Sequence, residues 1–365
     1  MAREAGVSIA TISRVFNQSA RVSEETRHRV RDTAARLGYW PNGAARSLIT
    51  RRTHALGALL PELHGEFFSE VIRGMDLAAR RHGFHLIVSS SHADAAELLA
   101  ALRSMRGRVD GLIAMTPDPG TPAAMDAFAP GLPMVLLNPG SPVRHADTLA
   151  IANVEGARAM VRHLARLGHR RIAFVCGPAH NIDAAQRLRG YRQALRAAGL
   201  EPRETPGAFT EASGYEAAKE LLRAAPRPDA IFAANDAMAT GVLGALREAG
   251  VRVPDDVAVA GFDDIVSAAW LDPPLTTVRV EPSRLGDLAV ERLLEAIAAP
   301  ADLRRRHEVV ATTLVVRRSC GAAARAGATD GVGAPAGATA DGNRSAHDGR
   351  IHPRRRAAPR TEVRS

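Results

Sequence analysis

The segment spanning residues 6–17 reads GVSIATISRVFN and carries, in its residue types, the turn and second helix of a helix-turn-helix. Gly6 accepts the positive φ that a tight turn between helices requires, and the Ser8 hydroxyl can bond an unpaired N–H of the helix that follows. The apolar side chains of that helix fall at i, i+3 and i+4, which predicts one buried stripe formed by Ile12, Val15 and Phe16.

The face opposite this stripe carries Ala10, Thr11, Arg14 and Asn17 and can donate hydrogen bonds. Arginine suits guanine edges or phosphates and asparagine suits adenine, so this face fits the reading of a DNA major groove. An ordinary amphipathic helix after a glycine turn shows the same pattern. These residues alone therefore leave DNA binding and plain packing as equal alternatives.

A third helix follows, and the three helical pieces can share one small core. Ser23 is a candidate N-cap, Glu24 and Glu25 favour the first turn through the helix dipole, and Gly38 ends the helix. Apolar positions of this helix recur at i, i+4 and i+7, at Val30, Ala34 and Leu37. Beyond it, the segment 42–49 (NGAARSLI) has helical propensity but too few residues for a stable isolated helix.

From residue 1 to about residue 316 the chain resembles the lactose and purine repressor (LacI/GalR) family. The resemblance rests on an ordered set of motifs: GVSIATISRVFN, RVSEETRHRV, LGYWPNGAARSL, FFSEVIRGM, RVDGLI, LARLGHRRIAFVCGP, RLRGY, AANDAMATGVL, VPDDVAVAGFDD and PPLTTV. It implies an α/β protein with an N-terminal helix-turn-helix head and a two-subdomain, periplasmic-binding-protein-like core of parallel sheets.

The resemblance also implies two sets of DNA contacts. In the head, the expected DNA-binding residues are Ser8, Ile9, Ala10, Thr11, Ser13, Arg14, Asn17 and Arg21. In the connector, Leu48 would wedge into the central base step of the operator minor groove, with Asn42 and Ala45 beside it. An apolar wedge can unstack and kink such a step. Packing of Leu48 on the core is the alternative.

The chain departs from the family pattern at three places. It opens in the middle of what should be the first helix, so we expect the true start to lie upstream. Gly65 and Glu66 stand where the family commonly has Asn-Pro, so the ligand can differ from the usual sugars. The base-reading positions Ile9 and Ala10 are small or apolar, which suggests contact with thymine methyl groups and leaves Arg14 as the main hydrogen-bonding reader.

Residues 55–316 alternate short apolar strands with amphipathic helices, which is typical of two parallel α/β units. In the first unit, strands are expected at 55–60, 85–89, 109–115 and 134–137, and helices near 67–81, 93–105 and 122–128. The second unit begins after about residue 151, with strands at 171–176, 230–233 and 257–260 and helices at 155–167, 185–198, 213–223 and 237–249. Ligands bind beyond the carboxyl ends of parallel strands, so the site should lie there, between the units.

Residues near these strand ends match the positions at which the family holds its small-molecule effector. The expected ligand-binding residues are Phe67, Phe68, Arg187, Phe209, Asn235 and Asp263. Their donors and acceptors suit a polyhydroxylated ligand, and an aromatic ring can stack on an apolar sugar face. Phe67 and Phe68 are expected in the loop after the first strand. Two structural alternatives are that Asp236 and Asp264 cap helices and that Arg187 pairs with a neighbouring carboxylate.

Positive charge is concentrated at the two ends of the chain. Residues 1–54 and residues 317–365 each carry a net charge of +6 and the whole chain +9, which leaves residues 55–316 at −3. A basic head supplies non-specific affinity for DNA phosphates. From about residue 321 the Gly-, Ala- and Pro-rich sequence lacks periodicity and is expected to be disordered, either as a solvated appendage or as a weak phosphate contact.

No sequence pattern supports catalysis, a metal site or a cofactor. Ser91, His92 and Asp94 are triad residue types, but adjacency is not triad geometry, and we interpret them as a loop and a helix cap. The histidines are too scattered to form a metal site. Cys176 is expected in a strand and Cys320 in the tail; with no signal peptide and no long apolar run, these separated thiols indicate a reduced cytoplasmic compartment and no membrane association.

We therefore expect four segments: a head at 1–40 with a truncated first helix, a hinge helix and linker at 41–54, an effector-binding and dimerisation core at 55–316, and a disordered basic tail at 317–365. The expected function is a homodimeric transcriptional repressor whose affinity for double-stranded operator DNA is controlled by a sugar or related metabolite. One alternative is a cytoplasmic sugar-binding sensor without competent DNA binding. Another is a periplasmic binding protein, which needs a secretion signal that residues 1–7 lack.

Overall fold

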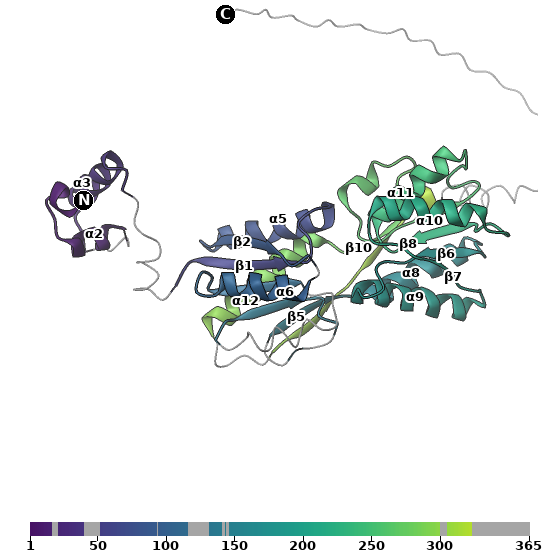
Figure 1. Cartoon of the computed structure of the whole chain (residues 1–365), viewed down its shortest axis with the longest axis horizontal. Helices are drawn as coiled ribbons and strands as arrows, with labels where there is room; N and C mark the ends of the chain where they lie inside the picture. Colours follow the sequence, from purple (N-terminus) through teal and green to yellow (C-terminus); the bar gives the residue numbers. More distant parts are fainter. Residues whose placement is uncertain are drawn as a thin grey trace, which may run out of the picture. The chain divides into compact units, whose positions relative to one another are not determined.

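The computed structural model describes residues 1–16, 21–39, 52–92, 94–115, 131–140, 143, 146–299 and 305–322. Three helices form the head at the N-terminal end of the chain (Figure 1): α1 (Ala2–Ala5), α2 (Ile9–Phe16) and α3 (Glu24–Arg36). The expected helix at 122–128 lies outside the described residues, as do Asn17, Asn42, Ala45 and Leu48.

The head folds as its local signals predict. Gly6 ends α1 with φ 61°, and the Ser8 hydroxyl oxygen accepts a hydrogen bond from the Thr11 N–H at 3.1 Å. Ser23 caps α3 by accepting from a backbone N–H of its first turn. The small core contains Ala5, Ile12, Val15 and Val30.

One position of the predicted α3 stripe is wrong. Leu37 is the C-cap of α3 and is 46% exposed, whereas Thr33 is buried. The Thr33 hydroxyl donates to the Arg29 carbonyl oxygen at 2.8 Å, so burial of this polar side chain leaves its donor satisfied. Leu37 stands at the C-cap, where the helix ends, so the helix does not hold its side chain against the core.

The first subdomain is built on a six-stranded sheet in the order β11-β5-β4-β3-β1-β2, in which all pairs are parallel. Its strands are β1 (Ala55–Leu60), β2 (His85–Ser90), β3 (Gly111–Met115), β4 (Met134–Leu137), β5 (Asp147–Ile151) and β11 (His307–Val310). Its described helices are α5 (Glu66–Arg81), α6 (Ala95–Met105) and α12 (Pro282–Ala298). β1, β3 and β4 are buried throughout, as expected for parallel strands covered on both faces.

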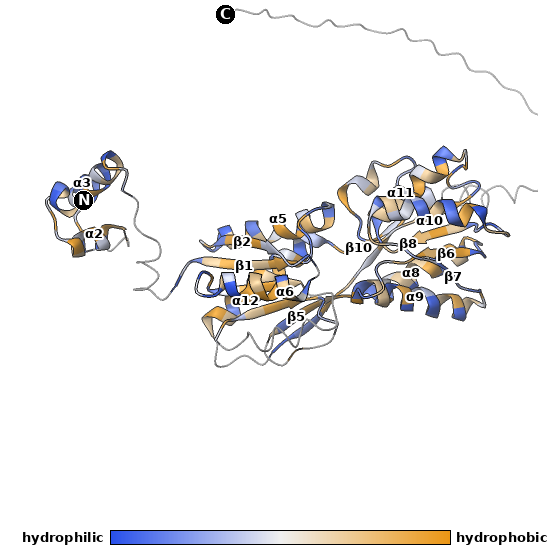
Figure 2. Cartoon of the chain, viewed as in Figure 1, coloured by the Kyte–Doolittle hydropathy of each residue, from blue (hydrophilic) through white to orange (hydrophobic). Residues whose placement is uncertain are grey.

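The second subdomain has a parallel four-stranded sheet in the order β7-β6-β8-β9. The strands are β6 (Ile172–Val175), β7 (Arg203–Thr205), β8 (Ala230–Ala233) and β9 (Ala258–Ala260). α8 (Asn153–Arg166) packs with α9 (Ile182–Ala198), and α10 (Glu211–Arg223) packs with α11 (Asp236–Glu248). Figure 2 shows the apolar strands enclosed by helices whose outer faces are hydrophilic.

The two units are not contiguous in sequence, which corrects the expected division at about residue 151. After β9, the chain forms the short 3-10 helix η1 (Val266–Ala269) and β10 (Thr277–Arg279), then returns to the first subdomain as α12 and β11. It crosses again into β12 (Thr313–Val315), which pairs antiparallel with β10.

Glycines allow α12 to lie directly against α5. A Cβ on Gly74 would fall 1.9 Å from the Ser283 carbonyl oxygen, and one on Gly286 would fall 2.2 Å from the Val71 carbonyl oxygen. Such distances are impossible, so any larger residue would push the helices apart. This contact between residues more than two hundred positions apart secures α12 to the first subdomain.

The expected core boundary at residue 316 is also wrong. The 3-10 helix η2 (Arg318–Cys320) packs on the second subdomain, and Ser319 and Cys320 are fully buried. The Ser319 hydroxyl donates to the Val259 carbonyl oxygen at 2.6 Å and accepts from the Thr276 N–H at 2.8 Å. Cys320 therefore belongs to the core, not to the tail.

Candidate functional site: effector cluster and DNA-reading helix

A buried ion pair lies at the centre of the candidate effector site. Arg187 comes from α9 and Asp263 from the segment after β9; Nη2 of the arginine lies 3.1 Å from Oδ1 of the aspartate. The guanidinium also donates from Nη1 to the Ala234 carbonyl oxygen at 2.6 Å. The backbone of Asp263 has a φ of 115°. Its N–H donates to the carbonyl oxygen of Val278 in β10, and its carbonyl oxygen accepts from the N–H of Val280. Arg187 thus pairs with a neighbouring carboxylate, as one structural alternative predicted.

Aromatic rings flank this pair. The Arg187 guanidinium lies 3.9 Å from the ring centroid of Phe262 and 5.7 Å from that of Phe209. Asn235 donates from Nδ2 to the Phe209 carbonyl oxygen at 3.1 Å, while its Oδ1 caps α11. Four predicted ligand residues, Arg187, Phe209, Asn235 and Asp263, therefore form one cluster.

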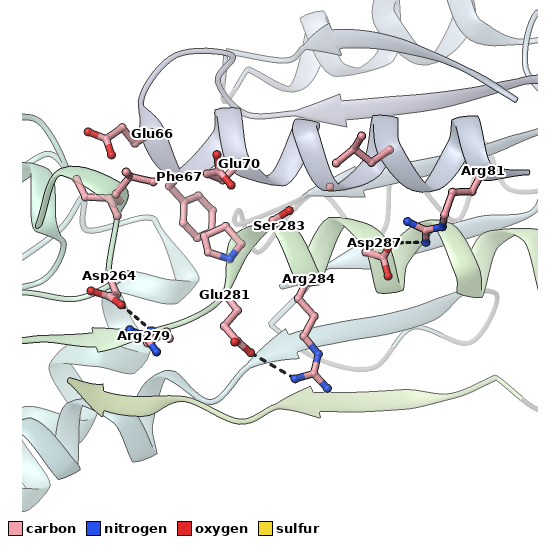
Figure 3. Close-up of a pocket in the computed structure, with 15 residues that line it drawn as sticks. Glu66, Phe67, Glu70, Arg81, Asp264, Arg279, Glu281, Ser283, Arg284 and Asp287 are labelled. Carbon is pink, nitrogen blue, oxygen red and sulfur yellow. Dashed lines mark hydrogen bonds and ion pairs between the residues drawn. The ribbon is translucent and has the colours of Figure 1, made fainter. Parts of the chain in front are cut away.

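Phe67 and Phe68 are placed differently from the expectation. They lie in the first turn of α5, not in a loop, with their rings edge to face and 5.4 Å between centroids. Phe67 lines a pocket of about 580 Å3 that runs along α5 and α12 to the loop after β9, where Asp264 lies opposite Phe67 (Figure 3). At one edge of this pocket, Oε2 of Glu66 in α5 accepts a hydrogen bond from the N–H of Ser267 in η1 at 2.9 Å. None of the four clustered residues lines this pocket.

Asp236 and Asp264 do not cap helices, so that alternative is wrong. Asp236 is fully buried and accepts from the Thr277 hydroxyl at 2.6 Å and from the Ile265 N–H at 3.0 Å. Asp264 pairs with Arg279 at 2.6 Å, as Figure 3 shows, and with Arg317 at 2.7 Å. The Asp236 carboxylate thus bonds both to β10 and to the loop after β9. The Asp264 carboxylate connects the same loop to the two segments that carry Arg279 and Arg317.

Sequence reasoning missed a second polar layer beneath the ion pair. Asp183 accepts from Nδ2 of Asn153 at 2.8 Å and from Nδ2 of Asn138 at 3.1 Å. Nε of Arg187 in turn donates to Oδ1 of Asn153 at 2.9 Å. A signal was present, because Asn138 directly follows the apolar strand β4; Asn153 was obscured because β5 was not predicted.

Burial governs the electrostatics of the cluster. Loss of solvent raises the pKa of Asp263 to about 6, although the Arg187 charge acts in the opposite direction. Burial likewise raises the pKa of Asp183 above its usual value. A proton or a ligand hydroxyl at Asp263 would therefore relieve an incompletely solvated charge.

The candidate DNA-reading face of α2 is open. Ile9 is 79% exposed, and Ser8, Ala10 and Arg14 are exposed as well, while Thr11 is half-buried. Ser13 is half-buried and Arg21 is exposed. The Ser8 hydroxyl also contacts the Thr11 hydroxyl at 3.0 Å, so its N-cap role occupies part of its hydrogen-bonding capacity.

The residues of triad type do not form a catalytic arrangement. Asp94 accepts from the N–H groups of Ala96 and Glu97 and caps α6, which confirms the helix-cap interpretation, and Ser91 is buried. Among the described residues, no three His, Cys, Asp or Glu side chains are grouped to hold a metal ion. Within the same residues, none of the helices has the length and apolar character needed to cross a bilayer.

Two family models match this chain: bacterial regulatory proteins of the lacI family at residues 1–42, and a periplasmic binding protein-like domain at residues 161–320. The ribose operon repressor of Escherichia coli K12 is 35% identical over 84% of this chain and 94% of its own length. The chain belongs to the lacI family of bacterial regulatory proteins. It is a DNA-binding transcriptional regulator and not an enzyme, as the sequence predicts.

Further relatives of this lacI-family regulator support its assignment to the family. The transcriptional regulator CelR of Thermobifida fusca is 36% identical over 86% of the chain and 95% of its own length. A CelR–cellobiose complex matches with a TM-score of 0.68 at 34% identity, covering 87% of this chain and 98% of that one. A Lac repressor dimer bound to operator and an anti-inducer matches with a TM-score of 0.79 at 30% identity, covering 87% and 97%.

Proposed function

We propose that this lacI-family regulator is a cytoplasmic homodimeric repressor whose operator affinity is controlled by a sugar or related polyhydroxylated metabolite. The observation that carries the proposal is the cluster in which the buried pair Arg187 and Asp263 lies beside the half-buried Asn235 and Phe209. The relatives support the ligand class, since one solved neighbour is a cellobiose complex and one relative is a ribose operon repressor.

The cluster offers complementary groups to neighbouring hydroxyls. Asp263 accepts, Arg187 donates, and a hydroxyl group does both, so a diol can bridge the two side chains where they now pair with each other. The Phe209 ring offers a face on which the apolar side of a sugar can stack. Because the protein already holds these side chains in place, little conformational entropy is lost on binding.

Control of operator binding would work through movement of one subdomain against the other. Of the proposed ligand residues, Arg187, Phe209, Asn235 and Asp263 belong to the second subdomain, whereas Phe67 and Phe68 belong to the first, which the chain from the head enters at β1. A coupling of about 1 to 3 kcal/mol changes the operator affinity about 5- to 150-fold. The same linkage gives induction or corepression, according to the arrangement that the ligand prefers.

On DNA, we propose that paired heads place α2 in successive major grooves of a near-palindrome. The proposed contacts of the connector are Asn42, Ala45 and Leu48, with Leu48 as the minor-groove wedge. The proposed segments are a head at 1–40, a hinge helix and linker at 41–54, a core from 55 to about 322, and a tail beyond it. The match to an operator-bound Lac repressor dimer supports this arrangement.

Two substitutions test the two halves of the proposal. Leu48→Ala should weaken binding to a duplex selected from genomic fragments and leave the calorimetric affinity for D-ribose or cellobiose unchanged. Asp263→Ala should abolish the sugar response with operator binding retained. Equal loss of both activities in either variant would contradict the separation of sites, and a wild-type chain with no preference for any fragment would leave a sugar sensor without DNA binding.

A further inference from the structure

Asp110 fixes the residues through which the chain from the head enters the first sheet. It lies directly before β3, and its Oδ1 accepts from the Thr53 N–H at 2.6 Å and the Thr53 hydroxyl at 2.8 Å. Its Oδ2 accepts from the His54 N–H at 3.0 Å, and its own N–H donates to the Ala55 carbonyl oxygen at 2.8 Å. Four hydrogen bonds thus connect one residue to the start of β1.

His54 is fixed from the other side as well. Its φ of 53° is in the left-handed region, and its carbonyl oxygen accepts from the His85 N–H at 2.9 Å, at the start of β2. Its ring lies 5.6 Å from the ring of Phe84. The residues directly before β1 are therefore hydrogen-bonded next to the strands on both sides of it. These bonds hold His54 in a left-handed backbone conformation that residues other than glycine rarely adopt.

The second subdomain contains the same arrangement without a head attached to it. Asp229 lies directly before β8 and accepts from the N–H groups of Arg170 and Arg171, at 3.1 and 3.0 Å, before β6. The Asp229 N–H donates to the Arg171 carbonyl oxygen at 3.0 Å. These hydrogen bonds fix the connection between α8 and β6, which stays within one subdomain. Asp229 therefore serves as a comparison for Asp110, because it can contribute to its sheet but not to the position of the head.

We infer that Asp110 is a positioning residue that makes the connector to the head follow the first subdomain as it moves. β1 runs from these hydrogen bonds, over about 20 Å, to the loop before α5, and Glu66 and Phe67 in the first turn of α5 line the pocket that also contains Asp264. When Thr53 and His54 are fixed to the sheet, a displacement of the sheet also displaces the connector and the head. When these hydrogen bonds are lost, the sheet can move without displacing the head. The inference rests on the proposed control of operator binding.

The test compares Asp110→Ala with Asp229→Ala in the full chain. The probe is a labelled duplex that the wild-type chain selects from a random pool. Asp110→Ala should lower affinity for it by about tenfold, because a looser connector lowers the effective concentration of the second head at its half-site. Asp229→Ala should keep operator affinity within about twofold of wild type.

Three further measurements separate positioning from folding. The slope of log affinity against log salt should stay at the wild-type value in Asp110→Ala, since no phosphate-contacting arginine has changed. Thr53→Ser should behave as wild type because it keeps the hydroxyl, whereas Thr53→Val should lose affinity, and it carries the test if Asp110→Ala fails to fold. Thermal unfolding monitors the fold of every variant.

Equal operator affinity in Asp110→Ala and Asp229→Ala, or wild-type affinity in both Asp110→Ala and Thr53→Val, overturns the inference and leaves the proposed function intact. A wild-type chain that selects no duplex overturns the proposed function and, with it, this inference.

Discussion

The guanidinium of Arg187 and the carboxylate of Asp263 lie 3.1 Å apart and are both buried, so each is the main counter-charge of the other. Removal of one partner from such a pair typically costs about 3 to 5 kcal/mol, because the other charge stays buried and unpaired. The residues proposed to bind the effector therefore also stabilise the second subdomain. Ligand affinity and unfolding free energy must both be measured for every variant of this pair.

The stability of the protein should depend on the protonation of Asp263. Burial raises its pKa from 3.8 to about 6, so the folded state binds a proton more tightly than the unfolded state does. The stabilisation by that proton is complete below about pH 4 and is lost as pH rises through about 6. The free energy of unfolding of wild type minus that of Asp263→Asn should fall over this range, as measured by urea denaturation; a difference that rises with pH would contradict the assignment.

Glu66 should hold the two subdomains together in the absence of ligand. Glu66→Ala removes the acceptor of the Ser267 N–H, a loss of about 0.5 to 1.5 kcal/mol for one exposed hydrogen bond. The radius of gyration from small-angle X-ray scattering should increase as separated arrangements gain population. Glu66→Gln keeps an acceptor oxygen and serves as the matched control. Identical scattering from all three proteins would show that the bond has no influence on closure.

Ile9 should determine base preference without contributing to the fold of the head. It is 79% exposed, whereas Ile12, one turn further along α2, is buried. Ile9→Asn should shift the sequences recovered by DNA selection towards adenine at one operator position, with the unfolding temperature unchanged. Ile12→Ala should instead destabilise the head by about 2 to 4 kcal/mol. An unchanged selection profile for Ile9→Asn would exclude this residue from base reading.

Two glycines in helices should respond in opposite directions to a methyl group. Gly286→Ala forces α12 away from α5 and should destabilise the protein by about 1 to 3 kcal/mol. Gly244 in α11 has no atom closer than 3.9 Å to an added Cβ, so Gly244→Ala should stabilise it by about 0.5 to 1 kcal/mol through helix propensity. Thermal unfolding distinguishes the two, and a stabilised Gly286→Ala would contradict the close approach of these helices.

Local chemistry made much of this protein predictable from its sequence. Gly6, Ser8 and Ser23 act on residues within a few positions, and a stripe at i, i+3 and i+4 selects its own buried face, so the head could be inferred without its partners. The same holds for the long amphipathic helices of the core and for Asp263, which comes three residues after the apolar strand β9.

Only the tertiary structure decided which subdomain α12 and β11 join, because that depends on the contacts of Gly74 with Ser283 and of Gly286 with Val71, each across more than two hundred residues. It also decided that Asp183 lies beneath Arg187, and that Ser319 and Cys320 belong to the core. β7, β10 and β12 have three residues each, too few to show a period, and they are strands because their neighbours complete their hydrogen bonds. Burial and pairing between distant segments are properties of the assembled chain, and no local pattern encodes them.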